Sequence, residues 1–193
     1  MFTLKTAMRS TVDTLLNPSN LWSRSEVLVR PCPIPLEQGI YAWYFRSLPP
    51  GVPESLSPQF DGLHLLYIGV SPAHESSKNN LRKRIQAHFR GNASSSTLRL
   101  TLGCLLSNTI GLRLRPTGST GRLTFADDET ILSDWLEQNA FVTWVSSPRP
   151  WVIEKDVISN ISPLLNLQHN KSSPFHSTLS AIRHQAQAAA RAF

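Results

Sequence analysis

Two basic side chains occupy the edge of an apolar stripe in the segment LRKRIQAHF, within a helix predicted from about 78 to 90. At about 100° per residue, the spacing of four between Arg84 and His88 stacks them on one side of the helix. They lie at the core-facing edge of a stripe that consists of Leu81, Ile85 and Phe89. We expect them to line a cleft between helix and sheet. The alternative is a snorkelling arginine beside a partly buried structural histidine.

A third ionisable residue, Glu154, falls inside the apolar arc of the helical segment PWVIEKDVISNI. A lone carboxylate facing a core is costly, so it should be protonated, paired with a cation or bound to a metal. Glu154 is therefore the candidate metal ligand, with a structural ion pair to an arginine as the alternative. Asn166 follows this helix and could cap its end, organise a turn or belong to the same site.

Two tyrosines stand in short apolar runs that predict strands, at 39–45 and 63–71. Tyr41 and Tyr67 each lie close to a glycine, where a plain core strand would favour a branched aliphatic residue. Strict alternation predicts two faces for the second strand, with Leu66, Ile68 and Val70 on one and Leu65, Tyr67, Gly69 and Ser71 on the other. A third strand is predicted at FVTWVSS.

The remaining elements are predicted from caps and breakers. They are a helix over 2–16, a serine-capped helix in 93–108, a hairpin in 110–125, an acidic helix in 126–140 and a C-terminal helix. Asp127, Asp128 and Glu129 would complement the positive end of the acidic helix. The C-terminal helix is predicted to begin with Ser173 as N-cap and Pro174 next. Its packing stripe would be Phe175, Leu179, Ile182, Ala186 and Ala189, which makes most of this helix structural. The alternative for its basic residues, His176, Arg183, His184 and Arg191, is contact with phosphates.

The chain carries a net charge of +6, and no acidic residue occurs between Glu75 and Asp127. That interval holds nine cations: Lys78, Arg82, Lys83, Arg84, Arg90, Arg99, Arg113, Arg115 and Arg122. All of them except Arg84 and Arg99 are predicted to contact nucleic acid, because a field of one sign attracts polyanions. A basic face kept for solubility is the alternative.

Composition limits the remaining possibilities. With 193 residues and 40% apolar content, the chain suits one domain with appendages. No apolar run is long enough for a membrane span, and charges interrupt the N-terminal segment, so we expect a cytoplasmic protein. Cys32 and Cys104 are far apart in sequence and indicate neither a disulfide-linked partner nor a zinc site.

These residues resemble the motifs of the GIY-YIG nuclease superfamily. GIY stands at 39–41 and YIG at 67–69, and the remaining motif residues follow in the family's order. Those are Arg84 and His88 in the helix motif, Glu154 as the metal-binding glutamate and Asn166 as the closing asparagine. Either tripeptide alone is weak, but the ordered set of six is specific. The likeness covers roughly 39–166.

The resemblance implies an α/β (α+β) fold with a small three-stranded antiparallel sheet flanked by helices. We expect an N-terminal extension over 1–38, a nuclease domain over 39–166, and a C-terminal helix in 167–193 that packs on it. The hairpin and the acidic helix, at about 109–140, would be insertions, and the spacer between GIY and YIG is longer than is usual in the family. These departures bear on substrate class more than on chemistry.

The implied activity is metal-dependent hydrolysis of DNA phosphodiester bonds, with RNA as a second possible substrate. Glu154 would hold one divalent cation, Mg²⁺ or alternatively Mn²⁺, and Arg84 would neutralise developing charge. Tyr41 and Tyr67 would position or deprotonate the water, with a phenol pKa lowered by nearby cations. His88 would share the proton transfer or hold a phosphate, and the motif glycines would let the backbone and a DNA strand approach closely. The alternative is a catalytically inactive nucleic-acid-binding module on the same fold.

Overall fold

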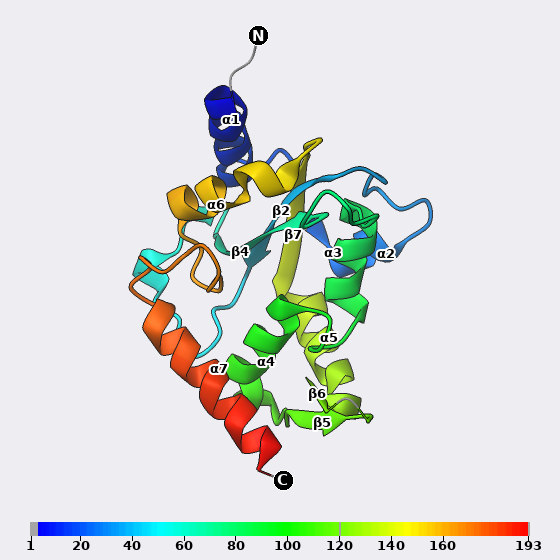
Figure 1. Cartoon of the computed structure of the whole chain (residues 1–193), viewed down its shortest axis with the longest axis vertical. Helices are drawn as coiled ribbons and strands as arrows, with labels where there is room; N and C mark the ends of the chain where they lie inside the picture. The colour runs from blue at the N-terminus through cyan, green and yellow to red at the C-terminus, as the bar shows by residue number, and fades with distance from the viewer. Residues whose placement is uncertain (1–3, 120, 193) are drawn as a thin grey trace.

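The structure is a computed structural model that describes residues 4–119 and 121–192 (Figure 1). The predicted first helix is present as α1, Leu4–Leu16, whereas residues 2 and 3 lie outside the described residues. Thr120, in the predicted hairpin turn, also lies outside them. None of the described helices has the length and hydropathy that a membrane span requires.

The centre of the molecule is an antiparallel sheet of five strands in the order β1-β7-β2-β4-β3. The three long strands stand next to one another: β7, Ala140–Ser146; β2, Gly39–Phe45; and β4, Leu63–Ser71. They confirm the predicted three-stranded antiparallel arrangement. The two further strands, β1 (Trp22–Ser23) and β3 (Gln59–Phe60), are short edge strands. Because β3 pairs only with the start of β4, the rest of that edge is free for other contacts.

Helices cover both faces of this sheet. One face packs against α1 and α6, Pro150–Ile161. The other packs against three helices: α3, Leu81–Arg90; α4, Thr97–Ile110; and α5, Glu129–Asn139. The last helix, α7 (His176–Arg191), runs along α4 at the end of the molecule away from α1 (Figure 1). Both faces are thus buried, which explains why β2 is buried along its whole length.

The remaining elements are short. They are α2 (Arg24–Leu28), the hairpin strands β5 (Arg115–Thr117) and β6 (Arg122–Thr124), and the 3₁₀ helices η1 (Glu54–Leu56) and η2 (Ala126–Asp128).

The strict alternation predicted for β4 is wrong at one point. Trp43 pairs with Tyr67 and Tyr44 with Leu65, so Leu66 is an extra residue that has no opposite number on β2. This bulge turns Leu66 to the same face as Tyr67, while Leu65 joins Ile68 on the opposite face. An inserted residue breaks the period of two, so alternation assigned Leu65 and Leu66 to the wrong faces.

Arg99 and Glu129 join the inserted acidic helix to the domain. The Arg99 guanidinium is fully buried and pairs with the Glu129 carboxylate at 2.7 Å. It also donates to the carbonyls of His88 and Phe89 at the end of α3. Glu129 lies in the first turn of α5 as predicted, and it is also one half of this ion pair and accepts from the backbone N–H of Ala93. Arg99 therefore holds α3 in place and is not part of the basic surface.

The C-terminal helix begins later than predicted. Phe175 is its N-cap residue, and the Ser173 hydroxyl is buried without a hydrogen-bond partner, so the predicted Ser173 cap is wrong. Leu179 is fully buried, and Ala190 rather than Ala189 completes the packing stripe near the C-terminus. This helix is fixed to α4 by these apolar contacts.

Candidate active site

His88 lies at the centre of the first group of predicted site residues, on the face of the sheet that α3 covers. It is fully buried, and its Nε2 is hydrogen-bonded to the Tyr41 hydroxyl at 2.8 Å. Its Nδ1 is hydrogen-bonded to the Ser96 hydroxyl at 2.7 Å. The Arg84 Nε lies 3.4 Å from the same Tyr41 oxygen. We call Tyr41, Arg84, His88 and Ser96 the His88 cluster.

Local structure explains why these four side chains meet. Arg84 and His88 are one helical turn apart on α3, which confirms their placement on the core-facing edge. Ser96 is the N-cap of α4, and its hydroxyl accepts from the backbone N–H of Arg99. A hydroxyl oxygen has two lone pairs, so Ser96 can accept from both Arg99 and His88. The sequence placed a serine cap here but gave no sign that it would touch His88.

The two motif glycines make room for neighbouring atoms of the protein. A Cβ at Gly69 would lie 2.4 Å from the Tyr41 hydroxyl oxygen. A Cβ at Gly39 would lie 2.3 Å from the carbonyl oxygen of Val145, which agrees with the predicted close approach of the backbone. The close approach of a DNA strand stays a prediction.

A second group of predicted residues lines a cleft of about 320 Å³ at the free edge of β4. Its walls include Tyr67 from β4, Glu154 from α6, Asn166 from the following loop and Arg183 from α7. We call this the Glu154 cleft. The Tyr67 ring borders both groups, because it packs against the His88 ring with centroids 6.1 Å apart. The six predicted site residues therefore converge, three on each side.

Asn166 builds the wall of this cleft through the backbone of Ile68. Its Oδ1 accepts from the Ile68 N–H at 2.9 Å, and its Nδ2 donates to the Ile68 carbonyl at 2.8 Å. Leu165 adds a backbone hydrogen bond to Leu66. The Asn166 amide thus pairs with β4 as another strand would, beyond the point where β3 ends. Both ends of the amide are engaged, so Asn166 positions the neighbouring Tyr67.

Glu154 is half-buried on α6 and forms no ion pair with any residue that the structure describes. The interpretation of Glu154 as half of a structural ion pair with an arginine is therefore wrong for the described chain. Burial raises the pKa of the Glu154 carboxyl above its ordinary value, and His169 opposes that rise. Residues 4–119 and 121–192 contain no group of three or more histidines, cysteines or carboxylates that could together hold a metal ion. One carboxylate at a polar cleft suits a hard cation that completes its shell with water and phosphate oxygens.

Burial shifts the pKa values of Tyr41, Tyr67 and His88 toward the neutral forms of these side chains. It raises the pKa of Tyr41, which Arg84 only partly opposes, and it raises the pKa of Tyr67. The expectation that nearby cations lower the phenol pKa is therefore wrong, because desolvation outweighs their charge. Burial also lowers the pKa of His88 well below 6.5, and Arg84 and Arg99 add to that shift. His88 is neutral at pH 7.

The predicted nucleic-acid contacts are spread over the surface. Lys78 and Lys83 are exposed near the start of α3, whereas the Arg82 guanidinium donates to the Ile34 carbonyl. Arg90 is exposed and donates to Gln86 on the same helix. Lys78 thus lies just before α3 and Lys83 in its first turn, and neither forms an ion pair with a described residue. These two exposed cations lie near the start of the helix that carries Arg84 and His88.

The cations of the hairpin lie elsewhere. Arg113 and Arg122 are exposed, but Arg115 pairs with Asp128 at 3.0 Å, so the acidic segment neutralises part of the hairpin. Figure 1 places this hairpin at the end of the molecule away from α6, which carries Glu154. A larger hollow of about 690 Å³ between α4, the hairpin and α7 contains none of the six predicted catalytic and metal-binding residues.

A comparison with known families decides what this constellation is. The family model of the GIY-YIG catalytic domain matches residues 39–185. The chain belongs to the GIY-YIG family. Neither the curated proteins nor the solved structures contain a significant match. GIY-YIG domains are nuclease domains that hydrolyse phosphodiester bonds and generally depend on a divalent metal, which makes nucleic acid the substrate class of this one. The match extends into α7, beyond Asn166, which is the last residue of the sequence motifs.

Proposed function

We propose that this protein is a divalent-metal-dependent endonuclease that cuts DNA in the Glu154 cleft. The observation that supports this most strongly is the placement of Glu154 and Tyr67 in one cleft, directly beside the His88 cluster. A purely binding domain would have no need for a half-buried carboxylate without an ion-pair partner in the described chain. Glu154 would hold the cation, Mg²⁺ or Mn²⁺, which when bound acts as a Lewis acid on the scissile phosphate.

Tyr67, Tyr41 and His88 each have a part in orienting the water and moving its proton. Tyr67 faces the cleft and orients the attacking water or the phosphate. Tyr41 accepts the proton of that water while its own hydroxyl proton moves to Nε2 of His88. This direction requires the tautomer in which Nδ1–H of His88 donates to Ser96, and the free lone pair of Ser96 supports it. The neutral state of His88 makes its Nε2 available as a proton acceptor.

Arg84 supplies positive charge next to the Tyr41 oxygen. Its NH1 donates to the Ser95 carbonyl at 2.8 Å, which fixes the guanidinium. A fixed cation stabilises negative charge on the phenol oxygen as its proton leaves, and charge on the phosphate as water attacks. The phosphorus–oxygen bond to the leaving sugar oxygen then breaks, that oxygen takes up a proton from water, and His88 returns its proton through Tyr41 to the hydroxide that remains.

The first experiment compares cutting by the wild type and Glu154→Gln. Supercoiled plasmid and end-labelled single strands of DNA and RNA are incubated with Mg²⁺, Mn²⁺ or chelator. We expect cutting that needs the metal and that falls at least about 10³-fold in the variant, because metal charge stabilisation is worth several kcal/mol. Asp156→Asn, an exposed charge change on the same helix, is the matched control and should cut normally.

Each of the other outcomes contradicts a different part of the proposal. Salt-sensitive binding with no strand breaks in any metal would contradict the nuclease proposal and leave the inactive binding module. Cutting that persists in Glu154→Gln would move the metal site elsewhere. Cutting of RNA alone would keep the chemistry and overturn the assignment of DNA.

A further inference from the structure

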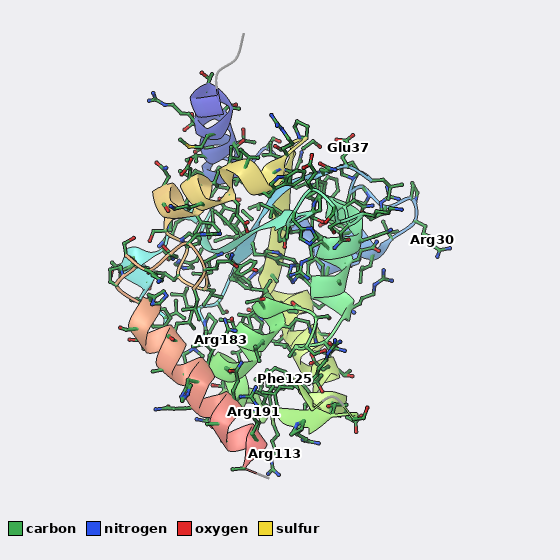
Figure 2. All side chains as sticks on the ribbon, viewed as in Figure 1. Arg30, Glu37, Arg113, Phe125, Arg183 and Arg191 are labelled. Carbon is green, nitrogen blue, oxygen red and sulfur yellow. The ribbon has the colours of Figure 1, made fainter. Side chains whose placement is uncertain are left out.

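Arg183 reaches the Glu154 cleft from α7, a helix outside the sequence motifs. It lines the cleft together with Tyr67, Glu154 and Asn166. The helix that carries it is firmly held, because Leu179 one turn earlier is fully buried against the core. In Figure 2, Arg183 lies beside the middle of α7 on the side facing the rest of the molecule, whereas Arg191 lies near the C-terminal end of the helix. Arg183 is thus a cation placed by a rigid element.

The guanidinium of Arg183 has unmet hydrogen-bonding capacity. Its Nε is buried and has no hydrogen-bond partner. No carboxylate in the described chain forms an ion pair with it. The contrast with Arg99 is direct, because Arg99 is also buried yet has a carboxylate, two carbonyls of α3 and a hydroxyl as partners. A buried donor left without a partner is costly, and a ligand that supplies an acceptor removes that cost.

The neighbours of Arg183 offer no negative charge at neutral pH. Arg183 interacts electrostatically with Cys104 and Tyr67. Burial raises the pKa of the Cys104 thiol to about 11 and raises the pKa of Tyr67, so both are protonated at pH 7. Glu154 lies in the same cleft but beyond ion-pair distance. The protein therefore keeps a cation and a carboxylate apart across one opening.

Such a pair suits a ligand that is anionic toward Arg183 and that brings a cation to Glu154. A phosphodiester with its divalent metal has these two properties. The planar guanidinium fork can bind two phosphate oxygens at once, which a single ammonium cannot do. Arg84, the arginine that the sequence motif singles out, already uses one donor on Ser95, whereas Arg183 has its Nε uncommitted.

We propose that Arg183 binds the non-bridging oxygens of the scissile phosphate in the Glu154 cleft. This inference rests on the proposed nuclease function, and it gives that site a second arginine, supplied by α7. Arg84 and Arg183 both interact electrostatically with the Tyr67 phenol, so the two cations approach that ring together. The phosphate is then held between two arginines with Tyr67 beside it.

The test compares Arg183→Gln with Arg191→Gln, which removes the same charge from an exposed position about two turns further along α7. We expect Arg183→Gln to lower kcat about 10²-fold, as loss of one preorganised donor does, while Arg191→Gln cuts like the wild type. Arg183→Lys keeps the charge but lacks the planar fork, so its kcat should lie between those of the two glutamine variants. Thermal unfolding shows that each variant is folded, and Arg183→Lys serves if the glutamine variant is not.

A binding measurement separates a phosphate contact from a structural role. In the Glu154→Gln background and without divalent metal, a fluorescein-labelled DNA duplex and its single strand are titrated at several salt concentrations. Loss of one phosphate contact lowers the slope of log K against log salt by about 0.7 to 0.9. We expect that decrease for Arg183→Gln, an unchanged slope for Arg191→Gln, and a retained slope for Arg183→Lys.

The outcomes distinguish this inference from the nuclease proposal. A wild type that cuts, with an Arg183→Gln variant that cuts equally fast, overturns the role of Arg183 and leaves the nuclease intact. A wild type that binds without cutting overturns the nuclease, and the salt slope then still decides whether Arg183 contacts a phosphate. Equal losses in Arg183→Gln and Arg191→Gln would indicate a general charge effect and contradict the inference.

Discussion

The His88 cluster and the Glu154 cleft meet at Tyr67 but are built in opposite ways. In the cluster, Tyr41 and His88 are almost fully buried and hydrogen-bonded to each other, and Ser96 and Arg84 complete the set. In the cleft, Glu154 and Arg183 are half-buried and have no ion-pair partner in the described chain. The polar groups of the cluster are satisfied by the protein itself, whereas the cleft offers charged groups to a ligand. This contrast supports our proposal that the first region transfers protons and the second binds the substrate.

Replacing Tyr41 with phenylalanine tests the His88 cluster and should cause the largest loss of activity. The ring would still fill the space above Gly69, but the hydroxyl that faces His88 would be gone. We expect kcat to fall about 10² to 10⁴-fold, the usual range for a lost general base, with DNA binding unchanged. Single-turnover cleavage and fluorescence titration measure the two quantities. Full activity in this variant would remove proton transfer from the His88 cluster.

Replacing Tyr67 with phenylalanine would test the Glu154 cleft in the same way. We expect a smaller loss of about 10²-fold, because misplacing the reactants costs that much while the base remains. The pH dependence of kcat should keep the wild-type shape, since Tyr41 and His88 are unaltered. A changed acidic limb in Tyr67→Phe would show that Tyr67, and not Tyr41, is the proton acceptor.

Asn166 allows a third test, in which the hydrogen bonds that build the wall of the Glu154 cleft are removed. Asn166→Ala would leave the N–H and carbonyl of Ile68 without their partners in a buried strand. We expect a loss of about 2 kcal/mol in the free energy of unfolding, measured by urea denaturation. Asn160→Ala, at an exposed position on α6, is the control and should unfold at the wild-type midpoint. Equal stability of the two variants would contradict a positioning role for Asn166.

The sequence predicted the elements of this site better than their contacts. Helical periodicity placed Arg84 and His88 at the core-facing edge of one helix and Glu154 inside the apolar arc of another, and both helices are present. The strands that carry Tyr41 and Tyr67 begin and end where the apolar runs do. These features depend on a single element at a time, so a local pattern is sufficient to find them.

The features that the sequence did not reveal all depend on two distant segments. Ser96 was expected only as a cap, and its contact with His88 requires α3 and α4 to be packed together. For Arg183, phosphate contact was an alternative shared with three other basic residues of the C-terminal helix, and only the placement of α7 brings it to Glu154. The raised phenol pKa values follow from burial, which composition does not show. Charge counting alone favoured the opposite shift.

The buried state of His88 also predicts a modest dependence of stability on pH. Its pKa is well below 6.5 in the folded chain and about 6.5 in the unfolded chain, so the unfolded state binds the extra proton. Stability should therefore rise with pH through this range and fall as the pH decreases below about 6.5. The loss should reach about 1 kcal/mol by about pH 5.5. Urea denaturation at each pH, with His88→Gln beside the wild type, measures it.

His184 provides the control for that measurement, because it is an exposed histidine on α7. His184→Gln should keep the wild-type pH dependence, whereas His88→Gln should lose about 1 kcal/mol of it over the same range. An unchanged pH dependence in His88→Gln would mean that the pKa of His88 is the same in the folded and the unfolded chain. The His88 ring would then be open to water rather than enclosed with Tyr41 and Ser96, and the division between a closed proton-transfer region and an open binding cleft would fail at its centre.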